Sequence, residues 1–128
     1  MTLSFENGIP EFLETERCSV KINSRVHRDG QYSLMVQSDQ EGTLWINGKV
    51  GAQEKDGKEG YLDKDNFVCW IHLNRPLSRA LKFSFYKDQQ ECCSFLFQTS
   101  FTGWRTCWVP FEDMEGKPVR GMNRIGVH

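Results

Sequence analysis

Apolar and polar residues alternate along most of this chain with a period of two, which is typical of β-strands that bury one face. The clearest case is residues 80–86, in which Leu81, Phe83 and Phe85 fall on the same face. Strands are predicted over residues 18–22, 32–37, 43–46, 66–73, 80–86, 91–98, 104–111 and 123–127. Turn signals that separate them by about 8–12 residues predict an all-β sandwich or barrel.

Helices have little support in the pattern. No segment keeps an apolar repeat of 3.6 residues, and the best helical candidate, residues 9–14, is too short to form a stable helix. Residues 47–65 are polar and rich in glycine, which predicts a long loop. Residues 66–73 (NFVCWIHL) are apolar on both faces, which predicts a central strand.

Length and charge narrow the class of protein. A chain of 128 residues is predicted to form one domain. Its net charge of −1 provides no strong basic field for nucleic acid. No apolar run reaches the roughly 18 residues of a membrane-spanning helix. The N-terminus lacks the basic and apolar regions of a signal peptide, so either the protein is cytoplasmic or its signal is absent from this sequence.

The five cysteines exclude two common frameworks. Their number is odd and no pair has Cys-x-x-Cys spacing, which argues against a zinc ribbon and against a full set of disulfides. Cys92 and Cys93 are adjacent, so at most one of them faces the core of a strand-based fold. We interpret the cysteines mainly as small buried apolar side chains, with a disulfide between neighbouring strands as the alternative.

Three segments carry a resemblance to a known family. They are LSFENGIP at residues 3–10, HRDGQYSL at residues 27–34, and FTGWRTCWVPF at residues 101–111, which is followed by EDMEGKP. The third is the most specific, because it is a long run of uncommon residues. In order and spacing the chain resembles the N-terminal domain of bacterial chondroitin sulfate ABC lyases, in polysaccharide lyase family 8.

The resemblance implies a fold and a context. The fold would be a jelly-roll β-sandwich similar to carbohydrate-binding modules, with residues 1–128 forming a single N-terminal domain of a larger enzyme. In that family the domain continues into at least one further strand. The elimination machinery, a histidine and a tyrosine with a supporting arginine and glutamate, lies in an (α/α) toroid, and no residue here matches it.

The implied function is therefore non-catalytic. The domain would help to bind or position a sulfated glycosaminoglycan, chondroitin or dermatan sulfate, and would pack on the catalytic domain of the same chain. The alternative is a purely structural brace that binds no sugar. The resemblance also implies a periplasmic or secreted bacterial protein.

A structural calcium site is a further implication of related jelly-roll modules. Glu6 and Asp29 would supply carboxylates, and residues 27–30, beginning with His27, would supply backbone carbonyls, which are ligands that Ca²⁺ accepts. The alternative is that Asp29 and Gly30 simply form a turn.

Aromatic and basic residues are the candidates for sugar contact. A flat indole suits the apolar face of a sugar ring, and an arginine suits a sulfate or carboxylate. We predict one exposed surface lined by Trp70 and His72 together with Lys82 and Tyr86 of the next strand, with Arg105 as an anion contact. The alternative is that the four tryptophans serve the core or a domain interface.

Motifs of common enzyme classes are absent from the sequence. His27, His72 and His128 are dispersed without metalloprotease spacing, and there is no Gly-x-Ser-x-Gly elbow or P-loop. Independent catalysis by this chain is not expected.

Overall fold

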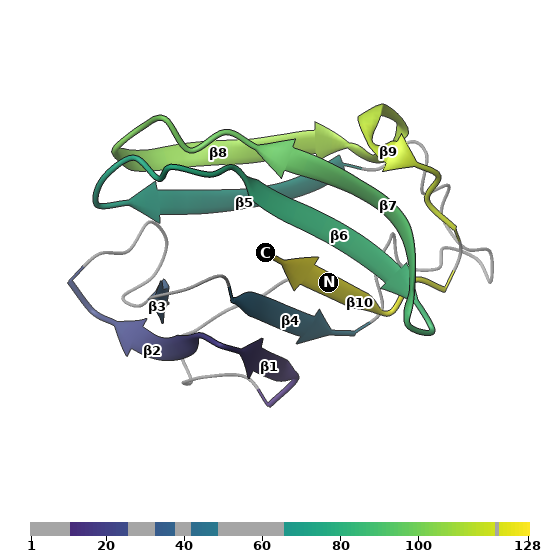
Figure 1. Cartoon of the computed structure of the whole chain (residues 1–128), viewed down its shortest axis with the longest axis horizontal. Coiled ribbons are helices and arrows are strands. Elements are labelled where there is room, and N and C mark those ends of the chain that lie inside the picture. The colour runs from purple at the N-terminus through teal and green to yellow at the C-terminus, as the bar shows by residue number, and fades with distance from the viewer. Residues whose placement is uncertain (1–10, 26–32, 38–41, 49–65, 120) are drawn as a thin grey trace, which may run out of the picture.

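The structure, a computed structural model, describes residues 11–25, 33–37, 42–48, 66–119 and 121–128. Ten strands and one 3-10 turn cover most of these residues (Figure 1). The strands are β1 (Leu13–Glu16), β2 (Ser19–Asn23), β3 (Ser33–Gln37), β4 (Thr43–Asn47), β5 (Asn66–Leu73), β6 (Leu81–Lys87), β7 (Gln90–Phe97), β8 (Gly103–Pro110), β9 (Glu115–Gly116) and β10 (Arg124–Val127), with η2 (Phe111–Asp113) after β8.

All the strand pairs are antiparallel. One sheet has six strands in the order β1-β4-β10-β6-β7-β9, and the pairs β2-β3 and β5-β8 form two further small sheets. In Figure 1 the β5-β8 pair lies at the top, whereas β1, β2, β3 and β4 lie at the bottom. The predicted all-β sandwich is confirmed.

Phenylalanine rings join the six-stranded sheet to the β5-β8 pair. Phe67 of β5 lies 5.5 Å from Phe83 and 5.3 Å from Phe85, both of β6, measured between ring centroids. Phe85 is fully buried, and it also meets Phe111 at 5.1 Å. Burial of each such ring contributes about 1.5–3 kcal/mol. The inward positions predicted from the alternation of β6 are therefore correct.

The turn between β6 and β7 lies at the break between the strands predicted over residues 80–86 and 91–98. Asp88 and Gln89 both have positive φ, 49° and 72°, as the tight turn of a two-residue hairpin requires. Asn123 holds this turn against β10, because its backbone N–H donates to Tyr86 O at 2.8 Å and its side-chain amide donates to Asp88 Oδ1 at 3.2 Å.

Two sequence expectations need correction. Residues 13–16 (LETE) form β1, which the sequence did not suggest, because pairing with β4 rather than local pattern sets its conformation. β5 is not flanked by two strands within the described part of the chain, where it pairs with β8 alone, and its outward Val68 and Trp70 are exposed. The predicted loop at 47–65 lies mostly outside the described residues.

Candidate functional site

The five residues predicted to contact sugar do not share one surface. Trp70 and His72 lie on β5 and point away from the core, on the side opposite to Phe67. Lys82 and Tyr86 lie on β6 and point away from Phe83 and Phe85, so they face the other side of the sandwich. The prediction of a single surface is therefore wrong, because the connection after β5 leads into a different sheet.

The outward face of β5 and β8, which we call the tryptophan face, consists of Val68, Trp70, His72, Trp104, Thr106 and Trp108. Its members oppose one another across the two strands, His72 with Trp104 and Val68 with Trp108. The rings of His72 and Trp104 meet edge to face at 5.1 Å. Trp70 is 46% exposed and Trp108 is 66% exposed, so large apolar surface reaches solvent here.

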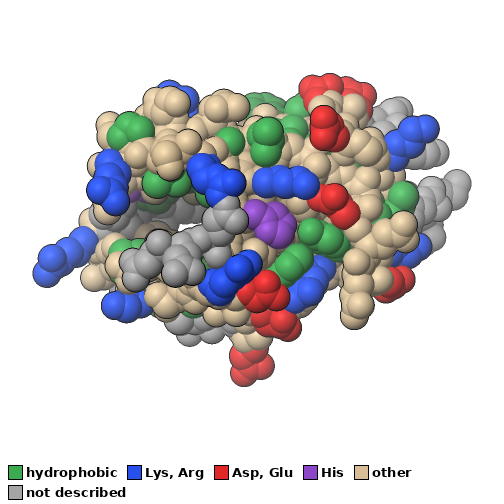
Figure 2. Space-filling view, in the orientation of Figure 1, with side chains coloured by type: hydrophobic (Ala, Val, Ile, Leu, Met, Phe, Trp, Pro, Cys, Tyr) green, Lys and Arg blue, Asp and Glu red, His purple; other side chains and the backbone are tan. Residues whose placement is uncertain are grey.

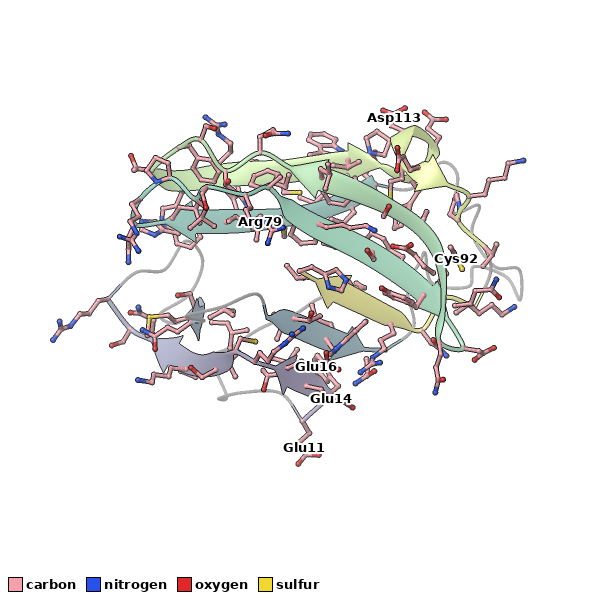
Figure 3. The ribbon with its side chains drawn as sticks, viewed as in Figure 1. Glu11, Glu14, Glu16, Arg79, Cys92 and Asp113 are labelled. Carbon is pink, nitrogen blue, oxygen red and sulfur yellow. The ribbon has the colours of Figure 1, made fainter. Side chains whose placement is uncertain are left out.

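Three exposed arginines lie in the connection between β5 and β6 and near the start of β8, and we call these two segments the arginine end; in Figure 3 Arg79 lies close to the start of β6. Arg75 and Arg79 belong to the connection between β5 and β6, and Arg105 is the third residue of β8. The guanidinium of Arg105 lies 4.6 Å from the centre of the buried Phe101 ring. Stacking on this ring orients the guanidinium and does not itself use the N–H groups as donors.

Thr99 holds the two loops of the arginine end together. Its hydroxyl donates to Arg79 O at 2.7 Å and lies 3.3 Å from Leu77 O, and its own carbonyl accepts the N–H of Leu77 at 3.1 Å. Thr99 is only 3% exposed, so these hydrogen bonds are shielded from water. The backbone that carries Arg79 is thus fixed against the connection between β7 and β8.

Charge is distributed unevenly over the molecule. No acidic residue occurs in residues 66–87 or 92–111, which include all three arginines of the arginine end. On the face shown in Figure 2, Lys and Arg side chains occur along the whole molecule, whereas Asp and Glu side chains gather toward the end opposite to that at which β5 ends and at the lower edge. In Figure 3 Asp113 lies beside β9, and Glu11, Glu14 and Glu16 lie around β1, all away from Arg79.

The outward face of the six-stranded sheet, which we call the polar face, includes Glu14, Trp45, Lys82, Tyr86, Glu91, Arg124 and His128. Its cations are engaged by carboxylates. Lys82 Nζ lies 3.2 Å from Glu91 Oε1, and Arg124 Nη2 donates to Glu14 Oε2 at 2.8 Å. The nearby Ser84 hydroxyl and then the Lys82 ammonium lower the pKa of Glu91, so this carboxyl stays ionised.

Trp45 is the centre of the polar face. The guanidinium of Arg124 lies 4.0 Å above its ring, and the rings of Tyr86 and His128 meet it edge to face at 5.2 and 5.7 Å. The indole passes over Gly126, where an added Cβ would come within 2.8 Å of Trp45 Cζ3. Burial and then the neighbouring Lys82 lower the pKa of His128.

The predicted calcium ligands Glu6, His27 and Asp29 all lie outside the described residues. Among the residues that the structure describes, no group of three or more His, Cys, Asp or Glu side chains is placed to hold a metal ion. The calcium site therefore stays a prediction. None of the described helical segments is long and apolar enough to cross a membrane.

Sequence reasoning missed Arg75 and Arg79. They lie in a connection, where no periodicity marks a residue as outward or inward. A usable signal was nevertheless present, because residues 66–87 combine four Lys or Arg side chains with no Asp or Glu.

Comparison with known proteins places this chain in a family. The family model described as "Lyase, N terminal" matches residues 1–128. The chain belongs to this family. It is 34% identical over 128 residues to a chondroitin sulfate ABC exolyase of Bacteroides thetaiotaomicron, and 31% identical over 122 residues to the enzyme of the same name from Proteus vulgaris.

These relatives are much longer than this chain. The alignments cover 97% and 94% of the chain but only 12% of each relative. The lyase N-terminal domain described above thus corresponds to about an eighth of an exolyase, and the expected resemblance to the chondroitin sulfate ABC lyases is confirmed.

Proposed function

We propose that this domain is a non-catalytic N-terminal part of a lyase and helps to bind or position a sulfated glycosaminoglycan, chondroitin or dermatan sulfate. The contact surface is the arginine end together with the adjoining part of the tryptophan face. Arg105 pairs with Ile71 and lies on the side of β8 opposite to Trp104, so the ligand would pass around the start of β8 to contact both. The proposal retains Trp70, His72 and Arg105 as sugar contacts and adds Arg75 and Arg79.

The observation that carries the proposal is the combination of three arginines with exposed indole surface on stretches of sequence, residues 66–87 and 92–111, that contain no acidic residue. Each guanidinium can engage a sulfate or uronate carboxylate through two parallel N–H···O bonds. Trp70 offers a flat apolar surface to the C–H face of a sugar ring. A polymer with alternating anionic groups and ring faces matches both features.

The polar face is a weaker candidate for the same ligand, although it contains Lys82 and Tyr86. Both Lys82 and Arg124 already face carboxylates at 3.2 and 2.8 Å, and a sulfate would have to displace these partners. The carboxylates of Glu14 and Glu91 would also repel the polyanion. We therefore assign the polar face a structural role.

Isothermal titration with a chondroitin sulfate oligosaccharide tests the proposal. Arg105→Ala should weaken binding about two- to fivefold, since an exposed ion pair contributes up to about 1 kcal/mol. Lys82→Ala is the matched control, because it removes the same charge from the other side of the sandwich and should leave the affinity unchanged. Equal weakening by both substitutions would indicate a non-specific charge effect and would refute the assigned surface.

The end of the tryptophan face that is farther from the arginine end favours a second role, as a contact with another domain. Val68 and Trp108 oppose each other and are 53% and 66% exposed, and they are remote from the arginine end because they lie at the other end of the paired strands. Exposed apolar surface of this kind is typical of a domain interface. We propose that it packs on the remainder of the lyase chain. If no saturable sugar binding is found at millimolar ligand, bracing alone is the function.

A further inference from the structure

Cys69 of β5 and Cys107 of β8 oppose each other directly across the two strands. Both side chains point into the core, and Cys107 is only 1% exposed. We propose that this pair is a disulfide site, which closes when the chain folds in the presence of a small-molecule disulfide. The inference is independent of the proposed sugar binding.

The backbone geometry suits the bond without rearrangement. Directly opposed residues of an antiparallel pair have Cα atoms about 4.5 or 5.5 Å apart, and both values fall within the range of about 4.4–6.8 Å found in disulfides. The two thiols are close enough to share a hydrogen bond, which raises the pKa of Cys69 and lowers that of Cys107, while burial opposes ionisation of both. The other described cysteines lack this arrangement: Cys93, for example, lies opposite Phe85 and Gly116.

The location gives the bond a structural purpose. Within the described part of the chain, β5 and β8 form a sheet of only two strands. A pair of strands is marginally stable unless something else holds it. A covalent link at its centre would fix the register that places Trp70 and Trp104 on one face.

The chemistry balances with oxidised glutathione as the electron acceptor. One cysteine thiolate attacks the glutathione disulfide, which forms a mixed disulfide and releases one glutathione. The second cysteine thiolate then attacks the mixed disulfide, which forms the Cys69–Cys107 bond and releases the second glutathione. The two protons lost by the cysteines are taken up by the two released thiolates, and the two electrons end on glutathione.

Burial determines when the reaction occurs. A thiolate must form and be reached by the oxidant, and neither happens readily at a site where Cys107 is 1% exposed. The folded reduced protein should therefore react slowly, and the chain refolded from denaturant in a glutathione redox buffer should close the bond. Slow disulfide formation in the native protein and fast disulfide formation during refolding would distinguish this site from an exposed pair of cysteines.

Peptide mass spectrometry and thermal unfolding test the inference. After refolding in the redox buffer, peptides carrying Cys69 and Cys107 should be joined, and three of the original five thiols should remain titratable. The midpoint temperature should rise by roughly 10 °C relative to the reduced protein, because the link closes a loop from residue 69 to residue 107. Cys107→Ala should abolish the cross-link and the rise, whereas Cys18→Ser should retain both.

Three outcomes would overturn the inference. These are five free thiols after oxidative refolding, a cross-link that involves a different cysteine, and a Cys69–Cys107 link that leaves the midpoint temperature unchanged or lowers it. Because Cys107→Ala could itself impair folding, Cys69→Ala serves as a second variant with the same expected loss of cross-link. None of these measurements depends on whether the domain binds sugar.

Discussion

Gly126 provides the sharpest test of how the polar face is built. Replacing it by alanine would place a Cβ 2.8 Å from Trp45 Cζ3, 3.2 Å from Trp45 Cε3 and 3.1 Å from His128 Nε2. The backbone of Gly126 is not among the described positions with positive φ, so alanine is conformationally acceptable there. The only penalty is steric, and it comes mainly from the indole.

The size of the effect follows from two opposing contributions. Forcing extra volume into a packed site costs about 1–3 kcal/mol. Exchanging a strand glycine for alanine stabilises by roughly 0.5–1 kcal/mol. In the native background Gly126→Ala should therefore lower the free energy of unfolding by about 0.5–2 kcal/mol. In a Trp45→Ala background the indole is gone, and the same substitution should be neutral or stabilising.

A double-mutant cycle measures the difference. Urea unfolding followed by far-ultraviolet circular dichroism suits all four proteins, since this signal does not depend on the tryptophan that is removed. The coupling free energy between Gly126 and Trp45 should be about 1–3 kcal/mol. If Gly126→Ala changes stability by the same amount, within about 0.5 kcal/mol, in both backgrounds, the indole does not lie across Gly126 and the described polar face is wrong.

Three further predictions concern the core, a glycine turn and the titration of a histidine. Phe85→Ala should lower the free energy of unfolding, measured in urea, by about 3–5 kcal/mol. Leu96→Ala, at a position that is 63% exposed, should change it by less than about 0.5 kcal/mol. Similar changes for the two substitutions would contradict the assigned core. Gly116→Ala should be severely destabilising, because φ is +80° and the new Cβ would overlap the Cys92 carbonyl oxygen; a midpoint temperature like that of the parent would refute this packing. The pKa of His128 is lowered in the folded protein, so the unfolded chain binds a proton on this histidine at a higher pH than the folded protein does. The contribution of neutral His128 to the free energy of unfolding should therefore be complete above the ordinary pKa of 6.5 and should be lost as the pH falls below it. Unfolding measured from about pH 7.5 to 5.5 should show this loss, and His128→Gln should reduce it; an unchanged slope would exclude His128 as its source.

The strands could be predicted where local alternation and turn chemistry agree. β6 and β7 are the clearest example, since Phe83 and Phe85 mark the inward face and residues 87–90 form the expected turn. β1 could not be predicted, because its sequence, LETE, has weak strand propensity, and its conformation depends on pairing with β4 about thirty residues later.

The arrangement of candidate site residues was harder to predict than the strands. Consecutive strands are neighbours in roughly two-thirds of cases, which favoured placing Lys82 beside Trp70. Here the chain changes sheet between β5 and β6, so the two residues face opposite sides. Which sheet a strand joins is decided by long-range packing, such as that of Phe67 on Phe85, and one sequence alone carries little information about it.

The contacts on the polar face could not be predicted from the sequence either. Trp45, Tyr86 and Arg124 come together from three strands of one sheet, and β10 lies between β4 and β6 only because the final segment of the chain inserts there. Nothing in the local pattern around Trp45 indicates these partners. The glycine at position 126 becomes informative only once the register of β4 and β10 is known.

The central claim is that sulfated sugar contacts the arginine end and the adjoining tryptophan face. A nuclear magnetic resonance titration with a chondroitin sulfate oligosaccharide tests it most directly, because the indole N–H of each tryptophan gives a separate signal. We predict progressive shifts of the Trp70 and Trp104 indoles and of the Arg105 amide, with the Trp45 indole unmoved. Shifts confined to Trp45 and its strands, or no shifts at millimolar sugar, would contradict the account.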